Sequence, residues 1–538
     1  MQRHLAPSLQ WSTTFMVAML ILSACAPRPT STLPIAQPEL TDTSPVLPIA
    51  TLPAPSLTPT PEKSPFLWVA PDVPAALRQA VSNIAGLKLV EQAEQATLIL
   101  DQSDQQFSTE LVQVAASQWI YALTAPFPTI SDGVSFADLS AKWYGQAPET
   151  FPTVPLLMSE DTLHALTSRF GTPAVDQVSV LPEEEILDAA WKQQAWAIIP
   201  FEQIEPRWKV LQLDGQSPIH NDFVLSAYPL AINFKLSSDP DVSQFENLSS
   251  HLPASNRDPS RMTVLDMTGV TAMVRATATR MEQKGVLYPA EDIGSLLASA
   301  DLTHISNEIP FAQDCPPPSP IFKGLLFCSS PNYIHLMEAV GTDLVEMTGN
   351  HFQDWGSAAT LFTIDLYDQH GWPHYGGGRD LADAQKPLLI ENHGNKLAFI
   401  GCNPVGPQFA WATPSQPGAA PCDFDLMHSQ IQQLRAQGYL PIVTFQYYEY
   451  YSAEARPNQL IDYRGMVDAG AEIVSGSQAH IPQVMEFYQD GFIHYGLGNL
   501  FFDQMAYLNK DGVLIEGTRN GFIDRHVIYD GRYISTEL

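Results

Sequence analysis

Short apolar runs alternate with amphipathic segments over the first half of the chain. Apolar runs at 66–70, 97–100, 119–123 and 196–200 predict strands, because each is short and rich in aromatic or β-branched residues. The segments 74–85 and 182–195 carry apolar residues at helical spacing and predict helices. This alternation indicates an α/β domain.

The second half of the chain repeats the alternation and adds polar clusters at the strand ends. The predicted strands are 262–267, 343–347, 396–402, 440–446, 472–475, 484–488 and 492–495, and helices are expected near 274–281 and 430–437. Polar side chains follow these strands at 301–308, 350–354, 446–449, 478–480 and 498–499. Sites in open α/β sheets lie beyond the carboxyl ends of strands, so these clusters are candidates for one site.

Changes of composition divide the chain into parts. Residues 26–65 hold eleven prolines among Thr, Ser and Ala, which favours an extended tether without a core. Residues 241–261 are polar and predict a linker. The expected organisation is a signal peptide (1–25), a tether (26–65), a first α/β domain (66–240), a linker (241–261) and a second domain (262–538).

Charge narrows the choice of partners. The 538 residues carry a formal net charge of -31 and are 45% hydrophobic. So acidic a chain disfavours nucleic acid and anionic membrane surfaces. The apolar content is sufficient for large cores.

The N-terminus has the features of an export signal. Arg3 precedes an apolar run, 15–22, that is too short to span a membrane. The following Leu22-Ser23-Ala24-Cys25 resembles the lipobox of bacterial lipoproteins, which implies lipidation of Cys25 and an extracytoplasmic protein anchored to the membrane. The alternative is an ordinary signal peptide with a chance cysteine.

The other cysteines fit an exported protein. With Cys25 set aside, four remain in two sequence-local pairs, Cys315 with Cys328 and Cys402 with Cys422. We expect two disulfides, because export places the chain in an oxidising environment.

The segments 121–130 and 195–202 resemble the periplasmic solute-binding-protein fold. This resemblance implies a smaller α/β domain that binds a ligand between two lobes, near 124–132. The alternative is a structural α/β domain without a ligand.

The stretch 348–356 places an amide, an imidazole and a carboxylate within five residues: Asn350, His351 and Asp354. At the junction of a strand and a helix, these groups suggest a metal or phosphate site. The alternative is a helix cap in which His351 only packs.

Further motifs occur in the same order as in one known family. They are Asn307-Glu308, Gly349-Asn350-His351 with Asp354, Glu449, Gly476-Ser477-Gln478-Ala479-His480 and the run 495–502. Together they resemble the bacterial capsule-synthesis and polyglutamate-export family of CapA type. The resemblance implies an α/β fold with a four-layer α/β/β/α sandwich, as in the calcineurin-like metallophosphoesterases.

The chain departs from the family pattern at three expected metal ligands. Val270 stands in place of an aspartate, and Gln446 and Gln478 stand in place of histidines. The resemblance leaves Glu308, Asn350 and His480 as the metal ligands, with Asp301 as a further candidate. These residues would hold one divalent metal of unknown identity, or the site would hold none.

The resemblance also implies roles for the other residues. His351, oriented by Asp354, would donate a proton to a leaving oxygen; without a metal the two form only a structural pair. Substrate contacts would come from Gln446, Glu449, Gln478 and Asn499. Asp301 and His304, three residues apart, are interpreted as solvated loop residues.

The expected function is the synthesis or attachment of a cell-envelope polymer: capsule, polyglutamate or peptidoglycan. Whether the protein is an enzyme stays open, between phosphoesterase-like hydrolysis and non-catalytic polymer binding. The expected partners are that polymer and the membrane, through the lipid anchor, but no nucleic acid.

Overall fold

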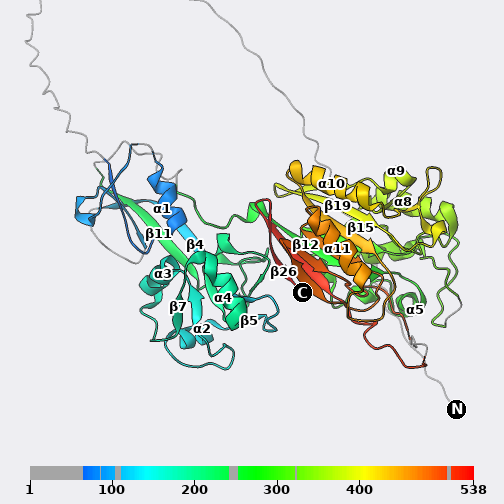
Figure 1. Ribbon diagram of the computed structural model, residues 1–538, viewed down its shortest axis with the longest axis horizontal. Coiled ribbons are helices and arrows are strands. Elements are labelled where there is room, and N and C mark those ends of the chain that lie inside the picture. Colours follow the sequence, from blue (N-terminus) through cyan, green and yellow to red (C-terminus); the bar gives the residue numbers. More distant parts are fainter. Residues whose placement is uncertain (1–64, 85, 103–110, 241–251, 322–323, 506–510) are drawn as a thin grey trace, which may run out of the picture. The chain divides into compact units, whose positions relative to one another are not determined.

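The computed structural model describes residues 65–538 except 85, 103–110, 241–251, 322–323 and 506–510 (Figure 1). The predicted signal peptide, Cys25 and nearly all of the tether therefore lie outside the described residues. Within the described part, every helix is too short or too polar to cross a membrane.

The first domain is built on a nine-stranded sheet with the order β2-β1-β3-β11-β4-β8-β6-β7, and β9 also pairs with β4. Its strands are β1 (Phe66–Val69), β2 (Lys88–Leu89), β3 (Leu98–Gln102), β4 (Val112–Pro126), β6 (Leu156–Met158), β7 (Val178–Val180), β8 (Ala197–Pro200), β9 (Trp208–Val210) and β11 (Ala231–Ser238). A separate pair joins β5 (Gly133–Val134) to β10 (Gln212–Leu213).

Strand β4 joins the two halves of this sheet. Its first part pairs with β11, and residues 121–124 pair with β8. One strand thus passes from a half built on β1, β3 and β11 into a half built on β6, β7 and β8. This is a two-part α/β arrangement of the kind expected for the first domain. The sequence pattern predicted only 119–123 of this strand, because residues 112–118 are largely exposed.

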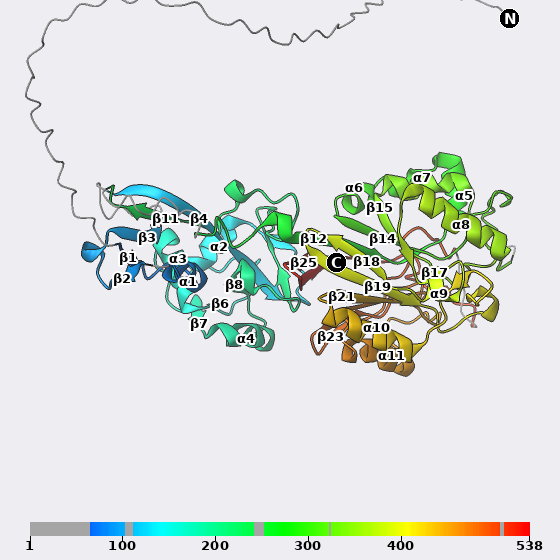
Figure 2. The ribbon, with the colours of Figure 1, turned by 90° about the horizontal axis from the view of Figure 1, so that it is seen from above.

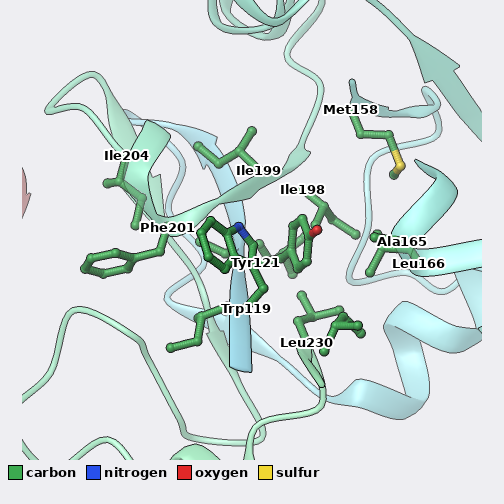
Figure 3. Packing of buried hydrophobic residues seen from close by; sticks show 14 of the residues in the cluster. Trp119, Tyr121, Met158, Ala165, Leu166, Ile198, Ile199, Phe201, Ile204 and Leu230 are labelled. Carbon is green, nitrogen blue, oxygen red and sulfur yellow. The ribbon is translucent and has the colours of Figure 1, made fainter. Parts of the chain in front are cut away.

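Four helices, α1 (Ala75–Ser82), α2 (Phe136–Trp143), α3 (Glu160–Phe170) and α4 (Ile186–Gln193), complete the first domain. Its core is shown in Figure 3, where Trp119 and Tyr121 of β4 pack among Ile198, Phe201 and Leu230. Thr124 lies in the region where a ligand was expected. It is buried, and its hydroxyl donates to the Ala197 carbonyl at 3.2 Å, so it serves sheet pairing.

The second domain contains two large sheets. The seven-stranded sheet has the order β16-β15-β14-β12-β25-β26, with β13 beside β14. Its strands are β12 (Met262–Thr268), β13 (Val270–Thr271), β14 (Leu302–Asn307), β15 (Thr342–Glu346), β16 (His374–Tyr375), β25 (Ile523–Tyr529) and β26 (Arg532–Glu537).

The six-stranded sheet has the order β18-β19-β21-β22-β24-β23. Its strands are β18 (Leu388–Asn392), β19 (Asn395–Cys402), β21 (Leu440–Gln446), β22 (Ile473–Ser477), β23 (Met485–Tyr488) and β24 (Gly491–His494). A short pair joins β17 (Gly377–Gly378) to β20 (Gly418–Ala419).

Helices cover the outer faces of both sheets (Figure 2). They are α5 (Arg275–Lys284), α6 (Gly294–Leu297), α7 (Ile334–Ala339) and α8 (Gly356–His370) on one side, with α9 (Leu381–Ala384), α10 (Phe424–Ala436) and α11 (Pro457–Asp468) on the other. On β21, Ile442 faces the core between the sheets, and its neighbour Val443 faces the core beneath α10 and α11. Successive side chains of a strand point to opposite faces of the sheet, so a strand with continuous apolar residues packs against another layer on each face. The predicted four-layer α/β/β/α sandwich is confirmed.

Both predicted disulfides are present. Cys315 bonds Cys328, and Cys402 bonds Cys422.

Candidate functional site

The polar clusters of the second domain meet where the two sheets end. Glu308 follows β14 and Asn350 follows β15, which pairs with β14 in parallel. Gln446 ends β21, and Gln478 follows the neighbouring parallel strand β22. Parallel strands place their carboxyl ends at one edge, and hydrogen bonds join the two groups of residues across the sheets.

A single amide nitrogen lies at the centre of this meeting point. Nε2 of Gln446 donates to Oε1 of Glu308 at 3.1 Å and to Oδ1 of Asn350 at 3.1 Å. It also contacts Oε1 of Gln478, and the hydroxyl of Ser477 donates to Oε1 of Gln446. Carboxylate and amide oxygens thus surround the neutral amide nitrogen of Gln446. The same oxygens would surround a cation if one were bound in its place.

Glycine allows the loop with Asn350 to approach this centre. A Cβ on Gly349 would lie 2.2 Å from the carbonyl oxygen of Glu308, so no larger residue fits without displacing the backbone. The loop before α8 therefore rests directly on the end of β14. This close approach explains why a glycine precedes Asn350 and His351.

His351 and Asp354 form a hydrogen-bonded pair beside this centre. Nδ1 of His351 lies 2.6 Å from Oδ2 of Asp354, which also accepts the backbone N–H of Phe327 at 2.9 Å. Burial disfavours the imidazolium, but the bond to Asp354 and the charge of Glu308 outweigh it and raise the pKa of His351. Since Nδ1 faces Asp354, the other ring nitrogen is the one that would meet a ligand.

Arg275 contributes a positive charge that the sequence analysis did not identify. It opens α5 with a left-handed φ of 48°, and its guanidinium lies 4.5 Å from the centre of the Phe327 ring. Nη1 of Arg275 donates to Oε1 of Gln504 at 3.3 Å. Burial lowers the pKa of Arg275 and the charge of Glu308 opposes this shift, yet a guanidinium stays charged in proteins. A lone arginine at a helix start matches no motif, so no sequence pattern indicated it.

His480 is tied to Asn499 and stacks among aromatic rings. Its Nδ1 lies 2.9 Å from Oδ1 of Asn499, whose amide donates to the Thr518 carbonyl at 2.9 Å. The rings of Tyr451 and Phe502 lie at centroid distances of 6.4 and 5.3 Å. His480 and Gln478 both have left-handed backbones, with φ of 55° and 77°. Strained residues of this kind concentrate at functional sites.

Glu449 stands at the edge of this region. It is exposed on the loop after β21 and accepts a hydrogen bond from the hydroxyl of Tyr451. Tyr451 also accepts from Nε2 of Gln504 at 2.8 Å, so the loop connects to the side chain that holds Arg275. Among the predicted contact residues, Glu449 is therefore the one placed on the surface.

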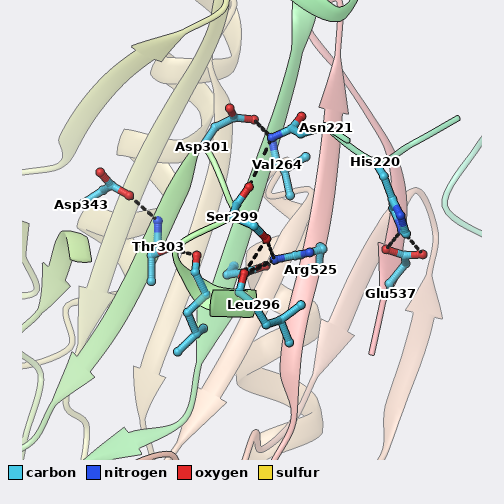
Figure 4. Close-up of polar contacts among 12 residues, drawn as sticks. His220, Asn221, Val264, Leu296, Ser299, Asp301, Thr303, Asp343, Arg525 and Glu537 are labelled. Carbon is cyan, nitrogen blue, oxygen red and sulfur yellow. Dashed lines mark hydrogen bonds and ion pairs between the residues drawn. The ribbon is translucent and has the colours of Figure 1, made fainter. Parts of the chain in front are cut away.

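Two sequence-based expectations were wrong. Asp301 precedes β14, at the opposite end of the strand from Glu308, and accepts the backbone N–H of Val264 at 2.8 Å (Figure 4). It is not a metal ligand of this site. His304 is not a solvated loop residue but lies buried within β14, 3.0 Å from the hydroxyl of Tyr375 and 3.3 Å from Glu346. The apolar residues around it were too few to reveal the strand.

The residues present do not fit the metal centre that the fold family implies. Within the described residues, no group of three or more His, Cys, Asp and Glu side chains is placed to hold a metal ion. Glu308 and Asn350 are hydrogen-bonded to Gln446 instead, and the hydrophobic Val270 is fully buried in β13. Neutral amides are poor ligands for transition metals and compensate little charge.

Comparison with known proteins finds a family model that is similar to much of the second domain. Residues 264–504 match the family model described as bacterial capsule synthesis protein PGA_cap. The capsule biosynthesis protein CapA of Bacillus anthracis is 25% identical over 269 residues, which cover 49% of this chain and 65% of that protein. The PGA biosynthesis protein CapA of Bacillus subtilis is 24% identical over 184 residues, covering 34% and 48%. The chain thus spans about half to two-thirds of the length of these relatives.

Solved structures align with parts of this chain at low similarity. An ABC-type phosphate transport receptor from Vibrio cholerae aligns with a TM-score of 0.30 and 11% identity, over 35% of this chain and 92% of that one. A 5'-nucleotidase precursor from Thermus thermophilus aligns with a TM-score of 0.30 and 14% identity, over 51% and 53%. TM-scores this low do not establish a shared fold. Residues 264–504, which form most of the four-layer sandwich, are thus similar to bacterial capsule-synthesis proteins of CapA type.

Proposed function

We propose that this protein acts at the cell surface in the synthesis or attachment of a capsule or poly-γ-glutamate-like polymer, and that it binds the polymer without a metal. The CapA-type family and the names of its relatives support the polymer class. The hydrogen bonds from Nε2 of Gln446 to Glu308 and Asn350 carry the metal-free part.

The binding surface would combine neutral amides with two positive groups. Asn350 offers an amide group, while Arg275 and His351, whose raised pKa favours the imidazolium, would attract the carboxylates of a polyglutamate chain. Glu449, which is exposed, would contact the polymer at the edge of the site. Binding of this kind needs no bond to break.

Hydrolysis of a phosphoester is the second candidate function. The His351–Asp354 hydrogen bond favours it, because a carboxylate that orients a protonated imidazole is a common arrangement for a general acid. The nucleophile would have to be activated without a metal, because the side chains at this site do not fit a metal ion.

Binding to poly-γ-glutamate, to purified capsule polysaccharide and to peptidoglycan fragments tests the first proposal. We expect one of these polymers to bind, and chelation with EDTA to leave its affinity unchanged. Gln446→Ala should weaken binding about tenfold or more, because it removes the donor that fixes Glu308 and Asn350. Gln433→Ala removes the same side chain from the exposed face of α10 and serves as the control.

Two results would reject the proposal. One is stoichiometric metal in the purified protein together with loss of polymer binding in EDTA. The other is failure of all three polymers to bind. Turnover of an aryl phosphate that disappears in His351→Ala would instead support the hydrolytic alternative.

We further propose that the protein is exported and anchored through a lipid on Cys25, with residues 26–65 as a spacer. The Leu-Ser-Ala-Cys sequence supports this placement. Metabolic labelling with a radioactive fatty acid should mark the wild-type protein and not Cys25→Ser. Equal labelling of both proteins would exclude this anchor.

A further inference from the structure

We propose that the cavity beside Arg275 binds a phosphate ester of an apolar alcohol, such as a prenyl phosphate. This inference goes beyond the proposed polymer binding, because it concerns a different ligand in a cavity that shares only Arg275 with the proposed polymer surface. Either proposal can fail while the other holds.

The cavity lies against the start of α5 and has a volume of about 350 Å³. Its walls include Met273, Val274, Ala278, Phe327, Tyr333 and Trp355. The volume lies within the range of about 300–1,000 Å³ that is usual for small-molecule sites. An apolar chain placed there would remove both its own surface and these walls from water.

One charged side chain, Arg275, belongs to the lining of this cavity. Its guanidinium packs on the rings of Phe327 at 4.5 Å and Phe502 at 5.9 Å, which fixes its plane. A planar guanidinium binds phosphate oxygens through two parallel hydrogen bonds. The position of Arg275 therefore assigns the anionic end of the ligand to this side of the cavity.

His351 lies near Arg275, on the Phe327 ring, but it is not part of the cavity lining. The Phe327 ring contacts both Arg275 and His351, whose ring centre lies 4.7 Å from that of Phe327. The nearby carboxylate of Glu308 opposes an anion, but one of its oxygens accepts a hydrogen bond from Gln446. Asp354 is likewise occupied by His351 and by the backbone N–H of Phe327. Arg275 is thus the group in the cavity lining that would bind the anion, while Glu308 and Glu449 lie close enough to affect its charge.

The apolar walls distinguish this ligand from the polymer. A polyglutamate or glycan chain would place amides, carboxylates or hydroxyls against methionine, valine and aromatic side chains. Buried polar groups without partners are costly. An alkyl or prenyl chain carries no such groups, and its phosphate would remain at Arg275.

Calorimetric titration of the purified full-length protein with three probes tests the proposal. The probes are farnesyl phosphate, farnesol, which lacks the phosphate, and inorganic phosphate, which lacks the chain. We expect farnesyl phosphate to bind about tenfold or more tightly than either of the others, since both ends contribute. Equal binding of farnesyl phosphate and farnesol would overturn the role of Arg275, and no binding of farnesyl phosphate would overturn the site.

Variants locate the binding. Arg275→Gln should weaken the binding of farnesyl phosphate about tenfold or more. Arg280→Gln removes the same charge from an exposed position on α5 and should leave this affinity unchanged. Ser330→Phe should fill the cavity and weaken the binding of farnesyl phosphate, without changing the binding of poly-γ-glutamate. Ser330 lines the cavity and is partly exposed, so the larger ring can be accommodated.

The outcomes separate the two proposals. Loss of farnesyl phosphate binding in Ser330→Phe with intact poly-γ-glutamate binding supports this inference. Unchanged affinity for farnesyl phosphate in both Arg275→Gln and Ser330→Phe overturns the inference, whether or not these variants change the binding of poly-γ-glutamate. Retained melting temperatures establish that the variants are folded.

Discussion

At the scale of single residues, Gln446 separates this site from a metal centre. Replacing Gln446 by histidine would put an imidazole nitrogen beside Glu308 and Asn350, which now accept hydrogen bonds from its amide. Imidazole is a good ligand for Zn²⁺, whereas an amide nitrogen is not. We expect Gln446→His to bind Zn²⁺ about tenfold or more tightly than the wild type, measured by calorimetry.

Gln433→His is the matched control for this gain. It adds an imidazole on the exposed face of α10, away from Glu308. If both variants bind Zn²⁺ equally, the oxygens around Gln446 are not arranged as cation ligands and our interpretation of the amide is wrong.

The protonation of His351 gives a second prediction. Its pKa is raised chiefly by the hydrogen bond to Asp354, against the effect of burial. Asp354→Asn should therefore move the pKa down toward the ordinary value of 6.5. Because the folded-state pKa is raised, the stabilisation from His351 is complete below about pH 6.5 and is lost as the pH rises through the folded pKa.

Titration of the His351 ring by NMR measures this shift. Asp368→Asn, at an exposed position on α8, is the control and should leave the titration of His351 in place. An unchanged titration in Asp354→Asn would show that the pair does not govern the proton.

Several residues of the site could be predicted from the sequence, for a simple reason. Asn350, Gln446 and Gln478 lie at the ends of strands whose apolar runs are visible, and parallel strands end at one edge; Glu308 was indicated by the family motif alone. Arg275 and Phe327 could not be predicted, because they come from a helix start and a loop whose positions depend on tertiary packing. Asp301 was misplaced because it precedes β14 whereas Glu308 follows it, so the whole strand separates the two carboxylates.

At the scale of elements, the disulfide between Cys315 and Cys328 holds the loop that carries Phe327. Phe327 supplies both the N–H to Asp354 and the ring between Arg275 and His351. Cys315→Ser with Cys328→Ser should lower the free energy of unfolding by about 3 kcal/mol, since the bond closes a short loop. It should also lower the pKa of His351, because Phe327 would no longer be fixed.

The double variant Cys402→Ser with Cys422→Ser is the comparison. It should lower the melting temperature by a similar amount, because its loop is of similar length, but it should not move the titration of His351. The same change of the His351 pKa in both double variants would contradict the link between this loop and the site.

Strand β25 carries a buried histidine that sets a pH limit on stability. Burial, with a smaller effect from His494, lowers the pKa of His526 to about 4, although Asp524 opposes this shift. Nδ1 of His526 lies 2.6 Å from the hydroxyl of Thr536 on β26. Since the folded-state pKa is depressed, the contribution of neutral His526 is complete above about pH 6.5 and is lost as the pH falls toward 4.

Urea unfolding at a series of pH values checks this limit. The stability advantage of the wild type over His526→Gln should be greatest above pH 6.5 and should shrink as the pH falls toward 4. His335→Gln changes an exposed histidine and should show no such trend. A constant difference between wild type and His526→Gln at all pH values would refute the assignment.

The elements differ in how visibly the sequence encodes them. Strands β19, β21 and β22 are buried on both faces, so their apolar runs are continuous and were predicted nearly to their bounds. Strands β11 and β26 mix apolar with polar residues and were not predicted. Their pairing comes from neighbours far away in the chain, which a local pattern cannot reveal.

At the scale of the whole molecule, the resemblance to a family predicted more than any local pattern did. The four-layer order follows from the CapA-type motifs, which are spread between Asn307 and Phe502. Hydrophobic patterns alone gave only an alternation of strands and helices, which fits many α/β folds. The ligand of the first domain stays a prediction, since its sheet topology does not identify one.

The charge of the whole chain gives the last prediction. Poly-γ-glutamate is a polyanion, and the protein has a formal net charge of -31, so the two repel over long distances while Arg275 and His351 attract locally. Salt screens the interaction between charges that are farther apart than the Debye length, which is about 10 Å at 0.1 M. It weakens partly buried contacts much less, so moderate salt reduces the long-range repulsion more than the local attraction. The association rate, measured by stopped-flow fluorescence, should therefore rise between about 10 mM and 150 mM salt. An uncharged dextran should show no such rise. Association that slows steadily with salt, as for proteins that bind nucleic acid through a basic surface, would mean that attraction by positive groups dominates at all distances.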